Sequence, residues 1–422
     1  MMMTYQNTTN PERKSVVIIG FGFGGFSLVR SFHKQARKFG IASSIITVIN
    51  KTDQLTFTPL LPMVSGGTVR PSSVIENISR TSERFGFTFV NATAKRINMQ
   101  DRMVETDRGG FKFDYVVVAT GSSDNFFGIP GAESNTHSLR NVSDAQFITS
   151  QSRHLVDKCR AQHTPGQRNE ASFVIVGGGL SGVETALSLN NSIKQKGGDT
   201  CRYQKNGVYL IEAGERVLPK EQKSVSDISL KELISSGIHV LTGTKVSSVN
   251  QGIVHLSDGS EIVAEEVIWT AGIKPNAIAI DHQGNGEYHE TGKIPVDSCL
   301  QSKEFPNVFA LGDCALIFDE KGERLPENAS VAVQEGEYLG KQLANIIGSG
   351  KSPRHPFKHW DLGHIIALGS DNIYVGPKKA ILRGKLAGLF AFTVSMLDLF
   401  SWENRHGVLF DEIIFRLHKR KA

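Results

Sequence analysis

Apolar runs rich in β-branched residues recur along the chain, each followed by a glycine-rich turn. The clearest are Val16–Ile19 and Phe173–Val176. Runs of this kind are typical of strands buried in a parallel sheet. The residues after the first run predict a helix over about 24–39, and the amphipathic stretch over about 327–347 predicts another. Strands that alternate with helices in this way indicate an α/β fold.

Shorter elements complete the pattern. A second strand is expected to end at Asn50, and a meander of short strands over about 87–118 ends in the run DYVVVATGSS. The run PNVFALGDCA predicts a strand that turns into a helix at Gly312 and Asp313. The polar stretch 151–171 separates two series of strands and helices, so we expect it to be a linker.

The two clearest strands open glycine fingerprints of the same type, VVIIGFGFGG and FVIVGGGLSG. In a dinucleotide site the first glycine makes the tight turn, and the second lets the backbone approach the pyrophosphate. The third lets the helix pack on the strand, so that the helix N-terminus faces the phosphates. Two fingerprints predict two bound nucleotides and electron transfer between them. The glycines are Gly20, Gly22 and Gly25, then Gly177, Gly179 and Gly182.

The residue that ends the second strand of each unit bears on the choice of nucleotide. In the second unit this residue is Glu212, whose carboxylate could accept the ribose hydroxyls of NAD and repel the extra phosphate of NADP. The alternative is an exposed loop carboxylate. In the first unit it is Asn50, which can bond a hydroxyl but carries no charge.

Two turns of small residues follow other buried strands. One contains Thr120 and Gly121, and the other contains Gly312 and Asp313. Turns of small residues let a nucleotide lie against the backbone. Asp313 could accept a hydroxyl from the ribityl chain of a flavin, and its alternative role is to cap a helix N-terminus.

Composition narrows the class of protein. A chain of 422 residues suits two or three domains. Its four cysteines show no CxxC or metal-like spacing, so we expect neither a disulfide framework nor a metal site. We expect the protein to lie in a reducing compartment. The polar N-terminus lacks the apolar core of a signal peptide. The longest apolar stretch, 386–397, is shorter than the roughly 20 residues that span a bilayer.

The formal net charge of +5 is concentrated at the C-terminus, because 377–422 contains nine basic and four acidic residues. Its apolar residues recur at the spacing of one helical face, and basic residues crowd its end. Such a segment can lie on anionic lipid. The alternatives are a helix packed on the protein or a homodimer contact. The apolar residues are Phe410, Ile413, Ile414 and Leu417, and the basic ones are Arg416, Lys419, Arg420 and Lys421.

Seven motifs occur in an order shared with two-dinucleotide-fold flavoproteins. The motifs are VVIIGFGFGG, LTFTPLLPMVSGG, FDYVVVATGSS, VIVGGGLSGVETA, VIWTAGIKPN, PNVFALGDCA and AVQEGEYLG. Over about 15–376 the chain most resembles type II NADH dehydrogenases, the single-subunit, non-proton-pumping NADH:quinone oxidoreductases. The resemblance implies two Rossmann-like domains and a C-terminal membrane-associating segment. We expect an FAD domain over 15–150 and 290–350, an inserted NADH domain over 165–285, and the C-terminal region over 355–422.

The resemblance also implies roles for single residues. Glu184 matches the family's glutamate near the nicotinamide and flavin rings, and its alternative role is a carboxylate favoured near a helix N-terminus. Pro59 and Leu60 match a loop close to the flavin. The residues implied for FAD are Gly20, Gly22, Gly25, Asn50, Thr120, Gly121, Gly312 and Asp313, and those for NADH are Gly177, Gly179, Gly182 and Glu212.

The chain departs from the family's pattern at two places. The family usually has an acid at the position of Asn50. Its quinone-site signature has an Ala-Gln pair where this chain has Ala329 and Ser330, although Gln334 is retained. The serine leaves the identity of the electron acceptor open.

Together these features predict an enzyme that passes hydride from NADH to FAD and then two electrons to a membrane quinone. Because such a quinone is lipid-soluble, we expect the protein to lie peripherally, as a monotopic protein, at the cytoplasmic face of a membrane. No nucleic-acid partner is expected. One alternative is a sulfide:quinone oxidoreductase-like flavoprotein, which needs cysteines near the flavin. Another is a flavin-binding signalling or scaffold protein that responds to NADH. A disulfide reductase is disfavoured because 1–150 contains no cysteine.

Overall fold

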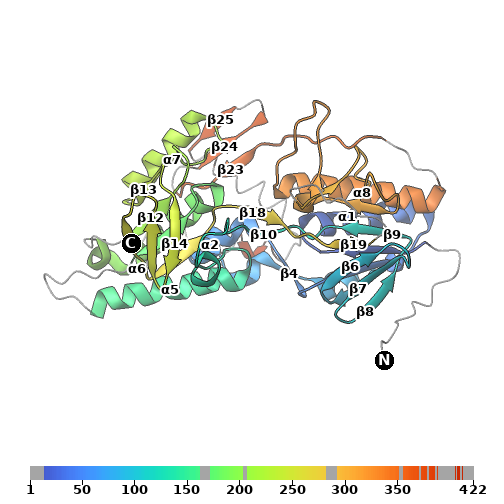
Figure 1. Cartoon of the computed structure of the whole chain (residues 1–422), viewed down its shortest axis with the longest axis horizontal. Coiled ribbons are helices and arrows are strands. Elements are labelled where there is room, and N and C mark those ends of the chain that lie inside the picture. The colour runs from blue at the N-terminus through green and yellow to red at the C-terminus, as the bar shows by residue number, and fades with distance from the viewer. Residues whose placement is uncertain are drawn as a thin grey trace. The chain divides into compact units, whose positions relative to one another are not determined.

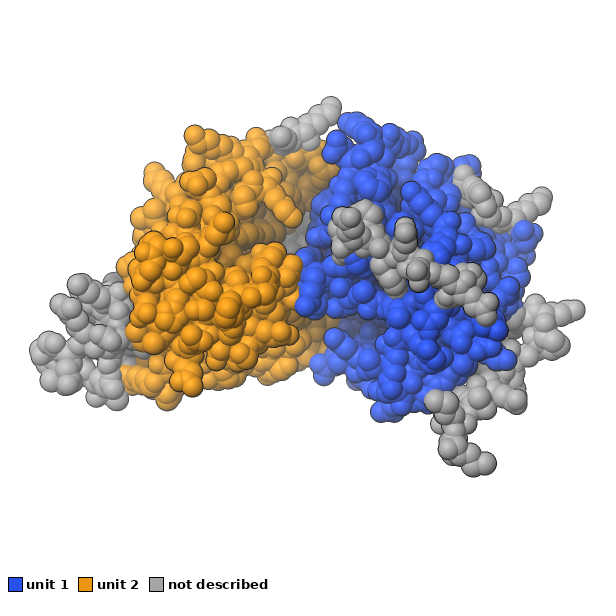
Figure 2. Space-filling view, in the orientation of Figure 1, with its two compact units in different colours: residues 1–55, 76–123, 273–360 blue, residues 56–75, 124–272, 361–422 orange. Residues whose placement is uncertain are grey.

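The fold consists of two compact units, each built around one fingerprint (Figures 1 and 2). Unit 1 comprises 1–55, 76–123 and 273–360, and unit 2 comprises 56–75, 124–272 and 361–422. Within them, the computed structural model describes residues 14–161, 172–202, 207–281, 292–350, 355–369, 372–377, 380–384, 387, 404, 406–408 and 411.

Unit 1 alternates strands and helices. Its strands are β1 (Val16–Ile19), β2 (Ile46–Asn50), β5 (Thr88–Asn91), β6 (Ala94–Asn98), β7 (Met103–Thr106), β8 (Gly109–Lys112), β9 (Tyr115–Val118), β18 (Ile273–Pro275), β19 (Ala279–Asp281), β20 (Ile294–Pro295), β21 (Val308–Ala310) and β22 (Ala315–Leu316). Its helices are α1 (Phe23–Ala36), α3 (Ile78–Phe85) and α8 (Ala329–Ser349), with 3-10 turns η1 (Arg37–Phe39), η2 (Ser43–Ile45) and η5 (Gly312–Cys314). Three strands cross unit boundaries: β3 (Gln54–Thr56), β4 (Ile75–Asn77) and β10 (Ser122–Asp124).

The main sheet of unit 1 is parallel, with strand order β21-β9-β1-β2-β5. Its central strand β1 is at most 3% exposed, as its apolar sequence predicted. Helices α1 and α8 lie side by side (Figure 1). Cβ atoms added at Gly336 and Gly340 of α8 would overlap carbonyl oxygens of α1, so the two backbones are in direct contact.

Unit 2 contains the second fingerprint. Its strands are β11 (Phe173–Val176), β12 (Val208–Ile211), β13 (His239–Leu241), β14 (Val246–Asn250), β15 (Ile253–Leu256), β16 (Glu261–Val263), β17 (Glu266–Trp269), β23 (His364–Ile366), β24 (Ile373–Val375) and β25 (Ile381–Arg383). Its helices are α2 (Leu61–Ser65), α4 (Ala132–Asn135), α5 (Val142–Ala161), α6 (Leu180–Arg202) and α7 (Lys223–Ser235), with 3-10 turns η3 (Thr58–Leu60) and η4 (Pro71–Val74).

Three sheets organise unit 2. The parallel sheet has the order β13-β12-β11-β17, and β14-β15-β16 and β23-β24-β25 form antiparallel sheets. Residues of the first two sheets, among them Val174, Val254 and Trp269, share one hydrophobic core. The predicted α/β fold with two Rossmann-like units is therefore confirmed.

Two local predictions were wrong. The expected linker is helical at its start, because α5 continues to Ala161, and 162–171 lie outside the described residues. The helix expected at Gly312 and Asp313 is the single 3-10 turn η5, and the next helix begins only at Ala329. A Gly–Asp turn after a strand can serve as a loop as readily as a helix start, and only tertiary contacts decide between them.

The four predicted domain ranges stay a prediction. The compact units divide the chain at other points, because 56–75 and the described residues after 360 cluster with the second fingerprint. Of the predicted amphipathic tail, residues 409, 410 and 412–422 lie outside the described residues.

Candidate functional site

The first fingerprint separates three glycine roles in unit 1. Gly20 has φ +97°, and an added Cβ would overlap the Ala119 carbonyl. A Cβ at Gly25 would lie 2.5 Å from the Gly20 oxygen, so the start of α1 packs directly on the turn. A Cβ at Gly22 would meet nothing within 4 Å. The backbone at Gly22 is thus open to a ligand, as a pyrophosphate site requires.

The second fingerprint repeats this geometry in unit 2. Gly177 has φ +108°, and its added Cβ would lie 2.5 Å from Ala271 Cα. A Cβ at Gly182 would overlap the Gly177 carbonyl, whereas one at Gly179 would meet nothing within 4 Å. Both turns therefore fit a dinucleotide, with the tight turn, the open approach and the helix contact at equivalent positions.

Asn50 and Glu212 occupy equivalent places. The Phe21 N–H donates to Asn50 Oδ1 at 3.0 Å, and the Gly178 N–H donates to Glu212 Oε2 at 2.7 Å. Each side chain thus joins the end of the second strand to the residue after the first glycine of its fingerprint. Glu212 Oε1 also accepts the Gly214 N–H at 2.7 Å, which holds the carboxylate at the end of β12.

The Thr120–Gly121 turn in unit 1 is clamped by Asn276. Thr120 Oγ1 donates to the Asn276 carbonyl at 2.7 Å, and Asn276 Nδ2 donates back to the Thr120 carbonyl at 2.9 Å. The Asn276 N–H also bonds the Gly121 carbonyl at 2.9 Å. Asn276 was not predicted as a site residue, although it ends the motif VIWTAGIKPN, which contributes to the family resemblance.

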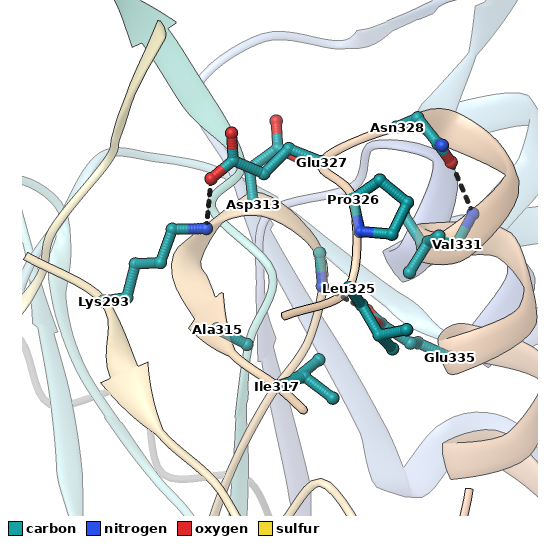
Figure 3. A pocket seen from close by; sticks show the side chains of 12 residues that line it. Lys293, Asp313, Ala315, Ile317, Leu325, Pro326, Glu327, Asn328, Val331 and Glu335 are labelled. Carbon is teal, nitrogen blue, oxygen red and sulfur yellow. Dashed lines mark hydrogen bonds and ion pairs between the residues drawn. The ribbon is translucent and has the colours of Figure 1, made fainter. Parts of the chain in front are cut away.

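A small pocket lies beside the Gly312–Asp313 turn (Figure 3). Asp313 Oδ2 accepts the Ser122 hydroxyl at 2.6 Å, so its carboxylate belongs to the same cluster of turns as Thr120. Lys293 Nζ and Glu327 Oε1 form an ion pair at 2.6 Å, and the Lys293 side chain is 3% exposed. Polar side chains and open backbone thus gather at the turns predicted for the flavin, and this donor set fits a ribityl chain and phosphates.

Glu335 is a second site residue that was not predicted from the sequence. It is 1% exposed, and its Oε2 accepts the Gly312 N–H at 2.6 Å. Burial raises the pKa of the Glu335 carboxyl to about 8, and the Gly312 N–H and Lys293 only partly oppose this. A protonated carboxyl therefore supports the Gly312 turn at neutral pH. Its place beside Gln334 in the motif AVQEGEYLG could have singled out the residue, but not its raised pKa.

Replacing Glu335 with glutamine tests this buried proton. The Glu335 carboxyl ionises near pH 4.5 in the unfolded chain, but only near pH 8 in the folded protein. As the pH rises between these values, the buried carboxyl therefore destabilises the fold increasingly. The cost is about 1.4 kcal/mol per pH unit and is constant above pH 8. Between pH 5 and 8.5, the free energy of unfolding of Glu335→Gln should rise relative to that of wild type by about 2 kcal/mol or more. Urea unfolding at each pH measures this difference. Glu337→Gln, at a half-exposed carboxylate of α8 that pairs with Arg30 at 2.7 Å, should show no such trend; a parallel trend would contradict the assignment.

Glu184 lies in the second turn of α6, after the second fingerprint. Its Oε1 accepts the Ala367 N–H at 2.8 Å, at the end of β23. Burial raises the pKa of the Glu184 carboxyl to about 8, and this one backbone hydrogen bond opposes the shift without cancelling it. The Glu184 carboxyl is therefore mostly protonated at neutral pH. A perturbed carboxyl beside a nucleotide turn is a candidate for proton chemistry.

Gln334 and Ser330 lie one turn apart on α8 in unit 1. Gln334 Oε1 accepts the Trp360 N–H at 2.9 Å, and Gln334 Nε2 donates to the Trp360 carbonyl at 3.0 Å. Gln334 Nε2 is also 3.3 Å from Ser330 Oγ. Gln334 therefore fixes the backbone of Trp360, a residue that is 75% exposed.

The structure thus brings the predicted residues together in two groups. Unit 1 holds the FAD residues together with Ser330 and Gln334, and unit 2 holds the NADH residues together with Glu184. Pro59 and Leu60 lie on η3 in unit 2, with Leu60 buried and Pro59 exposed. Among the described residues, no group of His, Cys, Asp and Glu could hold a metal ion. No described helix has the length and apolar character needed to cross a bilayer.

The sequence matches one family model and is similar to NADH dehydrogenases. A model of the pyridine nucleotide-disulphide oxidoreductases matches residues 14–336. A probable NADH dehydrogenase of Dictyostelium discoideum is 28% identical over 396 residues, which cover 90% of this chain and 83% of that protein. A type II NADH:quinone oxidoreductase of Staphylococcus saprophyticus is 27% identical over 397 residues, which cover 92% and 94%.

Solved structures extend the comparison to the fold. NDH2 of Plasmodium falciparum, solved in complex with NADH, superimposes with a TM-score of 0.82 at 19% identity, covering 95% of this chain and 98% of that one. The predicted resemblance to type II NADH dehydrogenases is confirmed. Because the family model spans more than three quarters of the sequence, this chain belongs to the pyridine nucleotide-disulphide oxidoreductase family.

Proposed function

We propose that this protein is a non-proton-pumping NADH:quinone oxidoreductase that holds FAD in unit 1 and binds NADH in unit 2. The observation that carries the proposal is the pair of fingerprints, each with an open glycine at the pyrophosphate position. The relatives named as NADH dehydrogenases and NADH:quinone oxidoreductases support the choice of donor and acceptor. When bound, FAD accepts two electrons from NADH and passes them to a quinone.

The residues of each unit have distinct tasks in this proposal. In unit 1, the open backbone at Gly22 receives the FAD pyrophosphate, and Asp313 accepts a ribityl hydroxyl. In unit 2, the open backbone at Gly179 receives the NADH pyrophosphate, and Glu212 accepts the ribose hydroxyls. The Glu212 carboxylate also disfavours the extra phosphate of NADPH, because two negative charges would meet at the end of β12.

Glu184 is the proposed proton-holding residue of the NADH site. The Ala367 N–H orients Oε1, which leaves the proton on Oε2. A carboxyl with a pKa of about 8 can give up or take back a proton near neutral pH. Gln334 and Ser330 are proposed to take part in acceptor binding in unit 1. Serine at 330 presents a hydroxyl where the family has an amide, and this hydroxyl lies 3.3 Å from Gln334 Nε2.

Sulfide oxidation requires a reactive thiolate, and Cys314, the cysteine beside the predicted flavin turn, is a weak candidate for that role. The Cys314 thiol is 2% exposed and donates to the Leu311 carbonyl at 3.2 Å. Burial raises the pKa of the Cys314 thiol, which keeps it protonated and unreactive.

An anaerobic donor series tests the proposed function. We expect NADH to bleach the bound flavin within the turnover time, NADPH to do so at least tenfold more slowly because of Glu212, and sulfide not to do so. A soluble quinone added afterwards should restore the oxidised flavin spectrum. Stopped-flow absorbance measures both steps separately. Flavin reduction too slow for turnover would instead favour an NADH-responsive signalling protein, and reduction by sulfide alone would favour a sulfide oxidoreductase.

We also propose a peripheral position on the cytoplasmic face of a membrane, because the acceptor is lipid-soluble and the C-terminus is basic. Deleting 377–422 is a poor test, since Val408 and Asp411 are 3% and 6% exposed and belong to the buried part of unit 2. Asp411 Oδ2 accepts the Ser73 hydroxyl at 2.9 Å, so deletion would uncover partners.

Neutralising the basic end of the tail is the sharper test. We expect replacement of Arg416, Lys419, Arg420 and Lys421 by glutamine to release most of the protein from anionic vesicles. Each basic residue contributes about 1 kcal/mol on such a surface. The measurement is cosedimentation with phosphatidylserine vesicles at low salt. Glutamine at four exposed lysines elsewhere is the control, and equal sedimentation of both variants would disprove the anchor. The control lysines are Lys38, Lys95, Lys112 and Lys231.

A further inference from the structure

Phe127 in unit 2 combines two properties that rarely occur together. Its backbone has φ +51°, a left-handed conformation that is unfavourable for a bulky side chain. The residue is also 61% exposed, so burial does not compensate for the backbone conformation. Residues held in sparsely populated conformations cluster at ligand sites, where the surrounding structure fixes them.

The surrounding contacts do fix this segment. The Asn125 N–H donates to the Gly272 carbonyl at 3.0 Å, and the Trp269 indole N–H donates to the Asn125 carbonyl at 2.9 Å. The Phe127 N–H then donates to Asn125 Oδ1 at 3.0 Å. The neighbouring Phe126 ring packs on Trp269 with centroids 5.5 Å apart. The exposed ring is therefore held at one place on unit 2.

That place is the end of β17. A Cβ added at Gly272 would lie 2.8 Å from Phe127 Cζ, so the ring lies directly against the Gly272 backbone. The preceding residue, Ala271, touches the first glycine of the fingerprint, since a Cβ at Gly177 would lie 2.5 Å from Ala271 Cα. The ring thus borders the same edge of the sheet as the phosphate turn.

The strand order shows which half of a dinucleotide reaches this point. The order β12-β11-β17 is parallel, so the carboxyl ends of the three strands form one edge. Ligands of such sheets cross this edge. Glu212 marks the ribose of the adenosine half at β12, and the fingerprint marks the pyrophosphate at β11. The other half of the nucleotide, which carries the nicotinamide, therefore extends over the end of β17.

We propose that Phe127 forms an aromatic wall for the nicotinamide half of the NADH bound by unit 2. This inference rests on the proposed NADH site and adds a positioning residue that the fingerprint does not contain. The flat, apolar ring offers stacking or edge contact to the nicotinamide riboside and excludes water from one side of it. The rigid attachment of the segment means that little side-chain and loop freedom is lost on binding.

Comparing two ligands isolates this contact. NAD⁺ carries the nicotinamide, whereas ADP-ribose has the same adenosine and pyrophosphate but lacks it, and neither reduces the flavin. Isothermal titration calorimetry on the full-length protein gives Kd for both. Phe127→Asn removes the ring but keeps a residue that tolerates positive φ, and Phe127→Tyr keeps the ring. Val263→Ala is the matched control, because Val263 is 52% exposed on β16 of the same unit.

We expect Phe127→Asn to raise the Kd of NAD⁺ by roughly three- to tenfold, the range for an aromatic contact, and to leave the Kd of ADP-ribose within twofold. Phe127→Tyr and Val263→Ala should bind both ligands like wild type. An unchanged Kd of NAD⁺ in Phe127→Asn, or an equal loss for both ligands, overturns the proposal. Failure of the wild-type protein to bind either ligand would instead overturn the proposed NADH site, and the wall with it.

Discussion

We expect Glu184→Gln to lower kcat for NADH oxidation with a soluble quinone by about 100-fold or more, the range expected when a proton-transferring group is lost. Glutamine keeps an oxygen that can accept the Ala367 N–H, so the fold and the position of β23 should be retained. What the variant loses is the proton on Oε2. The measurement is steady-state kinetics over pH 6–9, with binding of NAD⁺ measured separately to confirm that the site is intact.

The pH profile makes this expectation specific. With a pKa of about 8, the wild-type Glu184 carboxyl is protonated below pH 8 and loses its proton above it. If this proton is used, the wild-type rate falls as pH rises through 8, whereas the residual rate of Glu184→Gln does not change there. Glu133→Gln, at an exposed carboxylate of α4, is the control and should match wild type. A Glu184→Gln profile that still falls near pH 8 would assign the titration to another group.

Replacing Gly22 with alanine should impair FAD binding, whereas replacing Gly25 with alanine should impair the stability of the fold. A Cβ at Gly22 meets no protein atom within 4 Å, so Gly22→Ala should fold normally but obstruct the FAD pyrophosphate. A Cβ at Gly25 lies 2.5 Å from the Gly20 oxygen, so Gly25→Ala should destabilise the fold by about 1–3 kcal/mol, the usual cost of overpacking.

Flavin content and unfolding separate the two effects. For Gly22→Ala we expect at least a tenfold loss of FAD affinity, measured by fluorescence titration of the deflavinated protein, with urea unfolding of that protein unchanged. The second fingerprint supplies the matched control, because Gly179→Ala should weaken NAD⁺ binding and leave FAD content at the wild-type level. Loss of FAD in Gly179→Ala, or full FAD affinity in Gly22→Ala, would contradict the assignment of the two turns.

The expectations for Gly22 and Gly179 depend on features that a short stretch of sequence encodes. The positions of β1 and β11, their glycine turns and the α/β class follow from residues within about ten positions of one another. A buried parallel strand and a turn with positive φ each require specific residue types locally. Glu212 could be recognised for the same reason, since it ends the strand that follows the fingerprint and carries a charge suited to a ribose.

Other properties depend on contacts between distant parts of the chain. Glu184 is held by the Ala367 N–H, and Glu335 is enclosed beside the Gly312 turn, so the raised pKa of each carboxyl has no signature in its own segment. Asn276 clamps the Thr120 turn for a similarly non-local reason. The 3-10 turn at Gly312, where a helix was expected, also reflects its surroundings.

The sequence alone therefore specified which residues form the two nucleotide turns, because turn geometry and strand burial are encoded over a few neighbouring positions. The tertiary structure alone decided which carboxyls hold protons and where the Phe127 ring lies. Burial and hydrogen bonding are created only when segments such as α6 and β23, or 125–127 and β17, come together. Desolvation of a charge and the orientation of an exposed ring are properties of that assembled environment.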